Sequence, residues 1–281
     1  MSRVAIVTDS AANLPADYLV RYGIQVVPIL LHLERNTFRD GVDLAPRDFY
    51  QRMNGQTTSP TTSAPSVGDF LRTYASLGET APDIVSVHLS GKLSSTYLAA
   101  RTASSLVDSA TIHVLDCGSA AMGQGFVVLE AARAAEQGAS ADEVIRRVSE
   151  VSAKVEIIAT VSDLRWLVRS GRVPAAVGLA GSLLRICPIF RLRNGEAHPM
   201  EIQRTREHAA QRVAELVVKQ VNTRKAHIAV FHGQTPLEAA MLKDSIAARV
   251  NCVESFVTEF TPAMGAHTGP DVLGVAFFAE D

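Results

Sequence analysis

Cysteine is scarce in this sequence, and the few that occur exclude two kinds of site. Among 281 residues there are three, Cys117, Cys187 and Cys252, which are far apart and odd in number. Such cysteines fit neither a disulfide framework nor a zinc site, and they are typical of a reducing compartment. We therefore expect a cytoplasmic protein with no metal centre.

An excess of charge of one sign and long hydrophobic runs are missing as well. The formal net charge is -2, which gives no electrostatic basis for binding nucleic acid or an anionic membrane surface. The longest apolar region, residues 173–190, is interrupted by glycines, an arginine and prolines, so it is too short and too broken to span a membrane. Residues 1–10 lead directly into a strand-like pattern and have no signal-peptide character.

Signatures of common catalytic sites are also absent. There is no Walker phosphate loop, no nucleophile elbow of the G-x-S-x-G kind and no HExxH motif. Gly123 and Gly125 form only part of a dinucleotide-binding fingerprint. The sequence instead carries many hydroxyl side chains in polar segments and one histidine, His267, in an unusual setting.

What is present is a regular alternation of strand and helix patterns in the first half. Apolar runs at residues 4–7 and 24–31 predict strands on either side of a short helix. A strand, a helix and a strand in about thirty residues favour a parallel sheet. Further strands are predicted at residues 84–87 and 112–116. After residue 160, a hairpin turn at Arg193–Glu196 is mixed with helices, which indicates an α+β arrangement.

The length of 281 residues favours two domains over one. We predict an α/β protein with a Rossmann-like, parallel-sheet domain at residues 1–160 and an α+β domain at residues 161–281.

A hydroxyl-rich turn follows the predicted strand at residues 84–87. Ser90, Ser94, Ser95 and Thr96 lie just before a predicted helix that runs from Tyr97 to about Val107. The first N–H groups of a helix have no internal partner and the helix dipole favours negative charge there, so the turn suits an anion. The same pattern is explained if Ser94 only caps its helix.

Two other segments have both a functional and a plain structural interpretation. Residues 54–66 are rich in Ser, Thr and Pro and predict a loop, either a linker or a functional loop. His267 lies between Gly265 and Gly269, which let the backbone approach a ligand and expose the imidazole. Arg204, between the hairpin and a helix, has by pattern the character of an ordinary solvated arginine.

Two carboxylates end predicted strands at small-residue turns. Asp9 is followed by Ser10, and Asp116 by Cys117 and Gly118. A pair of this kind can suggest a metal or acid–base site. We favour the simpler interpretation, that both accept backbone N–H groups within their own turns.

Seven segments in order along the chain carry a resemblance to a known family. They are VTDSAANLP at 7–15, TTSAPSVGDF at 61–70, SGKLSSTYLAAR at 90–101, VLDCGSAAMGQG at 114–125, LRWLVRSGRV at 164–173, SLLRICPI at 182–189 and GAHTGPDVLG at 265–274. On these motifs the chain resembles the DegV family of bacterial fatty-acid-binding proteins over its whole length.

The resemblance implies a carrier without its own turnover or cofactor. One long-chain fatty acid, such as palmitate, would lie between the two domains, with its carboxylate bound by Thr62 and Ser94 and with His267 beside it. Ser63 and Ser95 adjoin these positions. The family also implies that a separate fatty acid kinase phosphorylates the bound acid, in lipid transport or fatty acid metabolism, and Arg204 matches an arginine linked to that partner.

The sequence departs from the family pattern at four positions. Ser95 stands in place of a usual glycine, and Ala64 in place of a polar residue. Cys187 replaces a lysine, and Asp271 replaces the last glycine of the GPG motif. None of the four is Thr62, Ser94 or His267. Chain-length preference and coupling to a kinase therefore do not follow from the resemblance.

Two alternative functions stay open at this point. His267 is a natural nucleophile or base for a phosphotransferase or hydrolase, with Ser94 or Thr62 nearby. A non-lipid anion-binding module is the other alternative, and it predicts a small polar cavity in place of a long apolar one. The small, apolar segment at residues 177–184 fits either a tail channel or ordinary core packing.

Overall fold

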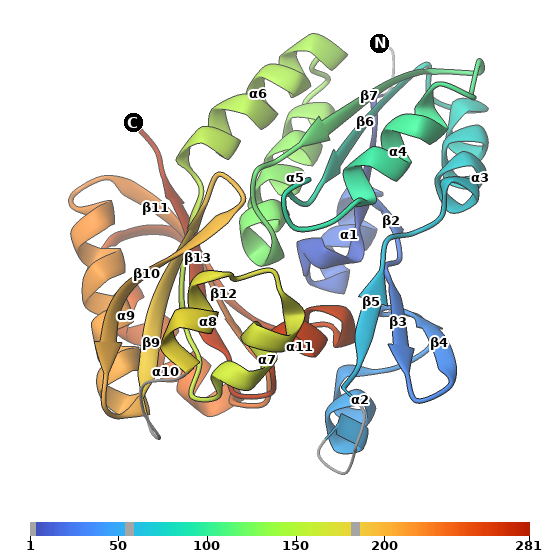
Figure 1. The fold of residues 1–281 in the computed structure, drawn as a ribbon. Helices are drawn as coiled ribbons and strands as arrows, with labels where there is room; N and C mark the ends of the chain where they lie inside the picture. The colour runs from blue at the N-terminus through green and yellow to red at the C-terminus, as the bar shows by residue number, and fades with distance from the viewer. Residues whose placement is uncertain (1–3, 54–58, 181–185) are drawn as a thin grey trace.

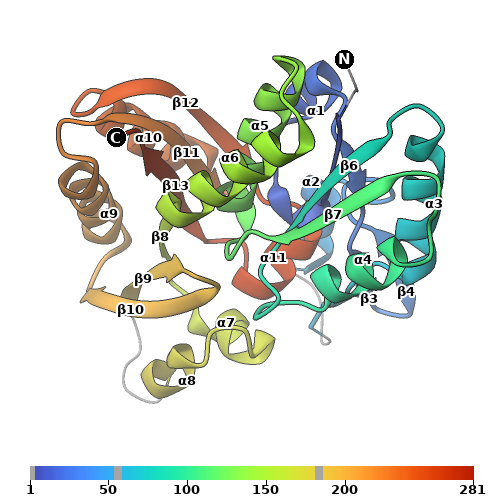
Figure 2. The same cartoon turned by 90° about the horizontal axis from the view of Figure 1, so that it is seen from above.

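A computed structural model describes residues 4–53, 59–180 and 186–281. The chain forms two lobes, with its first half on one side and its second half on the other (Figure 1). Two helices from the first half lie between the two main sheets (Figure 2). They are α5 (Ala121–Glu136) and α6 (Ala141–Lys154).

The first lobe is built on a four-stranded, fully parallel sheet in the order β2-β1-β6-β7. Its strands are β1 (Val4–Asp9), β2 (Gln25–Val27), β6 (Asp83–His88) and β7 (Thr111–Asp116). One face packs on α3 (Val67–Gly78) and α4 (Thr96–Ser104), and the other on α5. Helix α1 (Ala16–Tyr22) follows a short 3-10 turn at Ser10–Ala12. The predicted parallel α/β architecture of this half is confirmed.

A small antiparallel sheet extends from the first lobe beside the site. It is formed by β3 (Leu30–Leu33), β4 (Asn36–Arg39) and β5 (Thr61–Ser63), and α2 (Pro46–Met53) packs against it. The prediction of one strand over residues 24–31 was wrong, because the run is split at Pro28, which has no N–H for a sheet ladder.

The loop predicted for residues 54–66 was also wrong in part, since residues 61–63 pair with β3. Residues 54–58 lie outside the described residues. Phe38 and Arg39 belong to β4.

The second lobe contains a six-stranded mixed sheet in the order β10-β9-β8-β13-β11-β12, in which only β11 and β12 run parallel. The strands are β8 (Glu156–Thr160), β9 (Cys187–Arg193), β10 (Glu196–Gln203), β11 (Lys225–His232), β12 (Asn251–Glu259) and β13 (Leu273–Ala279). Helices α9 (Arg206–Val221) and α10 (Pro236–Ala247) cover one face, and α5 and α6 pack toward the other. The predicted hairpin and α+β character are confirmed.

Three short helices surround the region where the lobes meet. They are α7 (Leu164–Ser170), α8 (Ala175–Ala180) and α11 (Pro262–Thr268). β8 already belongs to the second sheet, and the domain boundary near residue 160 stays a prediction. Within the described residues, no helix has both the length and the apolar character needed to cross a bilayer.

Candidate functional site

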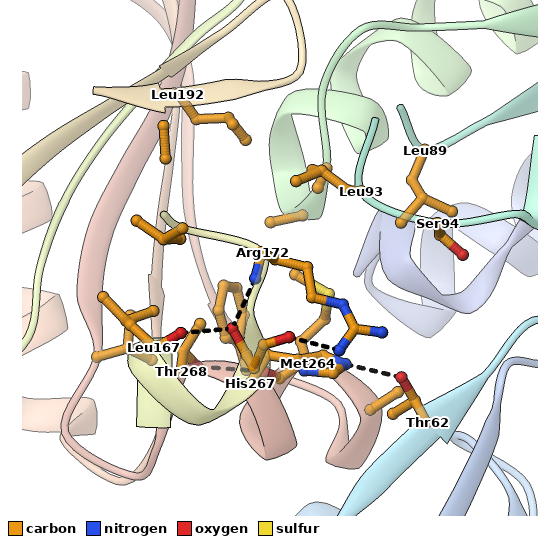
Figure 3. A pocket seen from close by; sticks show the side chains of 18 of the residues that line it. Thr62, Leu89, Leu93, Ser94, Leu167, Arg172, Leu192, Met264, His267 and Thr268 are labelled. Atoms are coloured by element: carbon orange, nitrogen blue, oxygen red, sulfur yellow. Dashed lines mark hydrogen bonds between the residues drawn. The ribbon is translucent and has the colours of Figure 1, made fainter. Parts of the chain in front are cut away.

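A cavity of about 440 Å³ lies where the two lobes meet. That volume is within the range typical of small-molecule sites. Most of its wall is apolar and comes from both halves of the chain, including Ile29, Leu89, Leu93, Ile157, Ala159, Leu167, Phe190, Leu192, Phe231, Phe260 and Met264. Polar side chains gather in one part of it, among them Thr62, Ser94, Arg172 and His267 (Figure 3).

Thr62 and His267 meet across the boundary between the lobes. β5 pairs with β3 in a register that sets Thr62 opposite Leu31 and faces its hydroxyl toward α11. The Thr62 Oγ1 atom lies 2.7 Å from His267 Nε2, within hydrogen-bond distance. Residues that are 205 positions apart therefore form one polar pair at the cavity wall.

Helix α11 holds His267 in place through close packing. A Cβ atom on Gly265 would lie 2.5 Å from the Tyr50 hydroxyl oxygen, so only glycine allows α11 to approach α2 this closely. The expectation that the flanking glycines expose the imidazole was wrong, because His267 is largely buried and Gly265 serves the contact with Tyr50. Pro262 begins a helix, His267 lies in its last turn, and Gly269 follows with a φ of 82°.

The environment of His267 makes its imidazole neutral at physiological pH. Burial, together with the positive charge of Arg172, lowers its pKa to about 4. A neutral imidazole has one N–H donor and one acceptor nitrogen. His267 and the Thr62 hydroxyl together can therefore offer hydrogen-bond donors to an anion without adding a positively charged imidazolium to the cavity.

Ser94 and Ser95 also line the cavity, in the turn that precedes α4. The Ser94 hydroxyl accepts from the Thr96 N–H at 3.2 Å and lies 2.9 Å from the Thr96 hydroxyl. The helix cap itself is Ser95, whose side chain makes no capping bond, so the prediction of Ser94 as the N-cap was off by one residue. Ser94 still satisfies the first helical N–H, and its oxygen faces the cavity (Figure 3).

The buried Asp9 and the exposed Asp116 hold this turn, and each accepts an N–H group within its own turn, as the sequence predicted. Asp9 accepts from the N–H groups of Ala11 at 3.0 Å and Leu89 at 3.2 Å. Asp116 accepts from Gly91 at 2.9 Å and Gly118 at 2.8 Å. Both carboxylates therefore fix the loop that leads to Ser94.

Arg172 is a site residue that the sequence analysis did not single out. It follows Gly171, which ends α7, and its side chain lies beside His267 (Figure 3). Its Nη1 donates to the Ser170 carbonyl at 2.6 Å. The residue is exposed, so its guanidinium stands at the rim of the cavity. Its motif had been noted, but nothing in the local pattern separates it from a solvated arginine.

The remaining predicted residues occupy different places. Ser63 lines the cavity, but its hydroxyl lies 2.9 Å from His32 Nε2. Arg204 is exposed in the turn between β10 and α9 and does not line the cavity. Val177 is 59% exposed, and residues 181–185 of the apolar segment lie outside the described residues. A tail channel formed by that segment stays a prediction.

Two of the residues that depart from the family pattern, Asp271 and Cys187, lie beside Ser162, just before α7. The Asp271 carboxylate accepts from the Ser162 N–H at 2.8 Å, and Cys187 Sγ lies 3.8 Å from the Ser162 hydroxyl. They support the segment that leads from β8 into α7. Ala64, a third departure, lines the cavity beside Ser63.

One cluster in the described part of the chain has the composition of a metal site. Ligand atoms of Glu130, His227 and Glu254 lie within 4.8 Å of one another. Arg133 bridges the two glutamates, at 2.7 Å from an oxygen of each. Glu130 also pairs with Arg147, so both carboxylates already have arginine partners, and the cluster ties the two lobes together.

Fold and site together define a two-lobed α/β protein with an apolar ligand cavity between its lobes and a polar group at one part of its wall. The chain belongs to the DegV family, whose model, described as that of uncharacterised proteins of this family, matches residues 3–280. A DegV domain-containing protein of Streptomyces coelicolor is 38% identical over 279 residues, covering 98% of each chain.

Solved structures of the family match the fold over nearly the whole chain. A structure described as showing fatty acid binding by a DegV family protein of Thermus thermophilus has a TM-score of 0.93 and 28% identity, covering 99% of this chain and 100% of that one. DegV of Bacillus subtilis, described as a fatty acid binding protein, has a TM-score of 0.90 and 30% identity, with both chains fully covered.

Proposed function

We propose that this protein binds one long-chain fatty acid, such as palmitate, with the tail in the cavity and the carboxylate at Thr62, Ser94 and His267. The observation that carries the proposal is an apolar cavity whose polar groups are concentrated around the Thr62–His267 pair. The fatty acid binding named for two relatives of the same fold supports it.

The energetics fit a carrier in which the tail supplies the affinity. Burial contributes about 0.8 kcal/mol per methylene, so about fifteen methylenes give roughly 12 kcal/mol before the costs of association. A hydrogen bond to a charged group contributes about 1.5–3 kcal/mol net. The head-group residues therefore determine which end of the ligand points to the rim, while Arg172 adds a charge that solvent screens.

The carboxylate would lie near the rim, where a second protein can reach it. We propose that a separate fatty acid kinase phosphorylates the bound acid and that Arg204 contacts this partner. The exposure of Arg204 away from the cavity supports a role in docking and not in head-group binding. The three free cysteines support a reducing, cytoplasmic compartment.

Mass spectrometry of an organic extract tests the binding proposal. Protein purified from bacteria should contain about one fatty acid per chain. We also expect Thr62→Ala combined with Ser94→Ala to weaken binding of a fluorescent fatty acid while the circular dichroism spectrum is retained. Absence of stoichiometric acid from the wild-type protein, together with no uptake of added acid, would contradict the proposal.

A kinase assay tests the second part separately. Arg204→Ala should bind fatty acid as the wild-type protein does but should be a poorer substrate for a DegV-dependent fatty acid kinase. Arg35→Ala, which removes an exposed arginine from the turn after β3, is the matched control. Equal phosphorylation of the acid on both variants would argue against Arg204 as a contact.

An enzyme that uses His267 is the second candidate, and the Thr62–His267 hydrogen bond is the observation in its favour, since a hydroxyl beside an imidazole is the arrangement of an activated nucleophile. A pKa of about 4 argues against it, because such an imidazole is a weak base at neutral pH. Hydrolysis or phosphoryl transfer by the isolated chain, lost in His267→Ala, would decide for this candidate.

A further inference from the structure

The sheet of the second lobe presents a regular stripe of side chains to the cavity. Val161, Ala159 and Ile157, alternate residues along β8 and just after it, all line the wall. α7 follows the carboxyl end of β8. β13 pairs antiparallel with β8, so α11, which precedes the amino end of β13, lies at the same end of the sheet as α7. The polar rim is therefore at the Val161 end. Ile157 lies about 13 Å deeper at about 3.3 Å per residue.

The middle of the stripe is a narrow notch. In the sheet register Phe231, Gly274, Ala159 and Phe190 stand side by side on four neighbouring strands. Two small residues thus lie between two phenylalanines. A Cβ atom on Gly274 would meet the Phe231 ring and would lie 2.7 Å from the Cβ of Ala159. The Phe231 ring occupies the space that a side chain at position 274 would fill, so the notch lies over Ala159, between the rings of Phe231 and Phe190.

The next row closes the cavity. Ile157 stands opposite Leu192 on β9, and both line the wall. Ile157 is only 4% exposed, and a Cβ atom on Gly123 of α5 would lie 3.1 Å from its Cδ1, so its side chain is held between the sheet and α5. Farther along the same face, the rings of Phe126 and Phe278 pack with centroids 5.4 Å apart. Ile157 is thus the last β8 side chain at the cavity wall.

We propose that Ile157 is the end stop that sets the longest acyl chain this protein accepts, and that Ala159 sets the room available just before it. The inference rests on the proposed function, since it assumes that a tail enters the notch from the polar rim. It assigns chain-length selection to one face of β8, remote from the head-group residues. Ile158, the residue between them, faces α9 in a separate core and is fully buried.

A competition among saturated fatty acids of graded length tests the end stop. The protein is loaded from an equimolar mixture, and the bound acids are identified by mass spectrometry. Ile157→Ala removes three side-chain carbons at the end of the cavity, so we expect the preferred chain to lengthen by about two carbons in a close-packed interior. Ala159→Leu fills the notch and should shorten it by a similar amount.

Ile158→Ala is the matched control, because it makes the same deletion on the opposite face of the same strand. It should lose comparable thermal stability and keep the wild-type preference. Should Ala159→Leu fail to fold, Ile157→Val should give a lengthening smaller than that of Ile157→Ala. Unchanged preference in Ile157→Ala, or shifts in the same direction for both cavity variants, would overturn the end stop. A wild-type protein that takes up none of the acids would instead contradict the proposed function.

Discussion

Removing the Thr62 hydroxyl is the sharpest perturbation of the proposed head-group site. Thr62→Val keeps the shape of the side chain but deletes the oxygen that lies 2.7 Å from His267 Nε2. The variant loses one hydrogen bond to a charged carboxylate, which is worth about 1.5–3 kcal/mol. At 1.4 kcal/mol per tenfold, the dissociation constant should rise by about tenfold to a hundredfold.

The assay is a titration with a fluorescent fatty acid and, in parallel, with its methyl ester. The ester has no carboxylate charge, so its affinity should change much less than that of the acid. Thr61→Val is the matched control, since Thr61 is the exposed preceding residue on β5 and does not line the cavity. Equal affinity of wild type and Thr62→Val for the acid would refute the reasoning. An equal loss for acid and ester would refute it too.

Three further outcomes follow from the site. Burial lowers the pKa of His267 in the folded protein to about 4, so between pH 4 and about 6.5 the unfolded chain binds more protons than the folded one. Acidification through this window should therefore reduce the free energy of unfolding by at most about 3 kcal/mol. Urea titrations should show a smaller loss in His267→Gln. Gly265→Ala should lower the melting temperature and weaken fatty acid binding, because its Cβ would collide with Tyr50, at a cost of about 1–3 kcal/mol. Gly178→Ala, which meets nothing within 4 Å, should leave binding unchanged. Arg172→Gln should weaken binding of the acid a few-fold at low salt and less at high salt, as expected of an exposed charge, and a loss independent of salt would contradict this.

Local patterns were sufficient for most strands and helices, whereas the candidate head-group residues came from the resemblance to the family. The local patterns failed where distant pairing decides the structure. Thr62 lies in a segment that the composition assigns to a loop, yet it forms β5 because β3, about thirty residues earlier, offers an edge. The strand predicted over 24–31 is divided because Pro28 cannot donate to a ladder.

The site itself shows the same limit. His267 was chosen correctly as a cavity residue, but for the wrong local reason: Gly265 serves the contact between α11 and Tyr50, and this contact is visible only in three dimensions. Arg172 has no local signal at all, because its role depends on the segment after α7 passing beside α11. The row that ends at Ile157 likewise arises from register across strands that are far apart in sequence.

A crystal structure of the protein loaded with palmitic acid tests the central claim most directly. The account predicts one acyl chain in the cavity between the lobes, with its carboxylate within hydrogen-bond distance of Thr62 and His267 and its methyl end at Ile157. A carboxylate bound elsewhere, a reversed chain, or a cavity without lipid at saturating palmitate would contradict it.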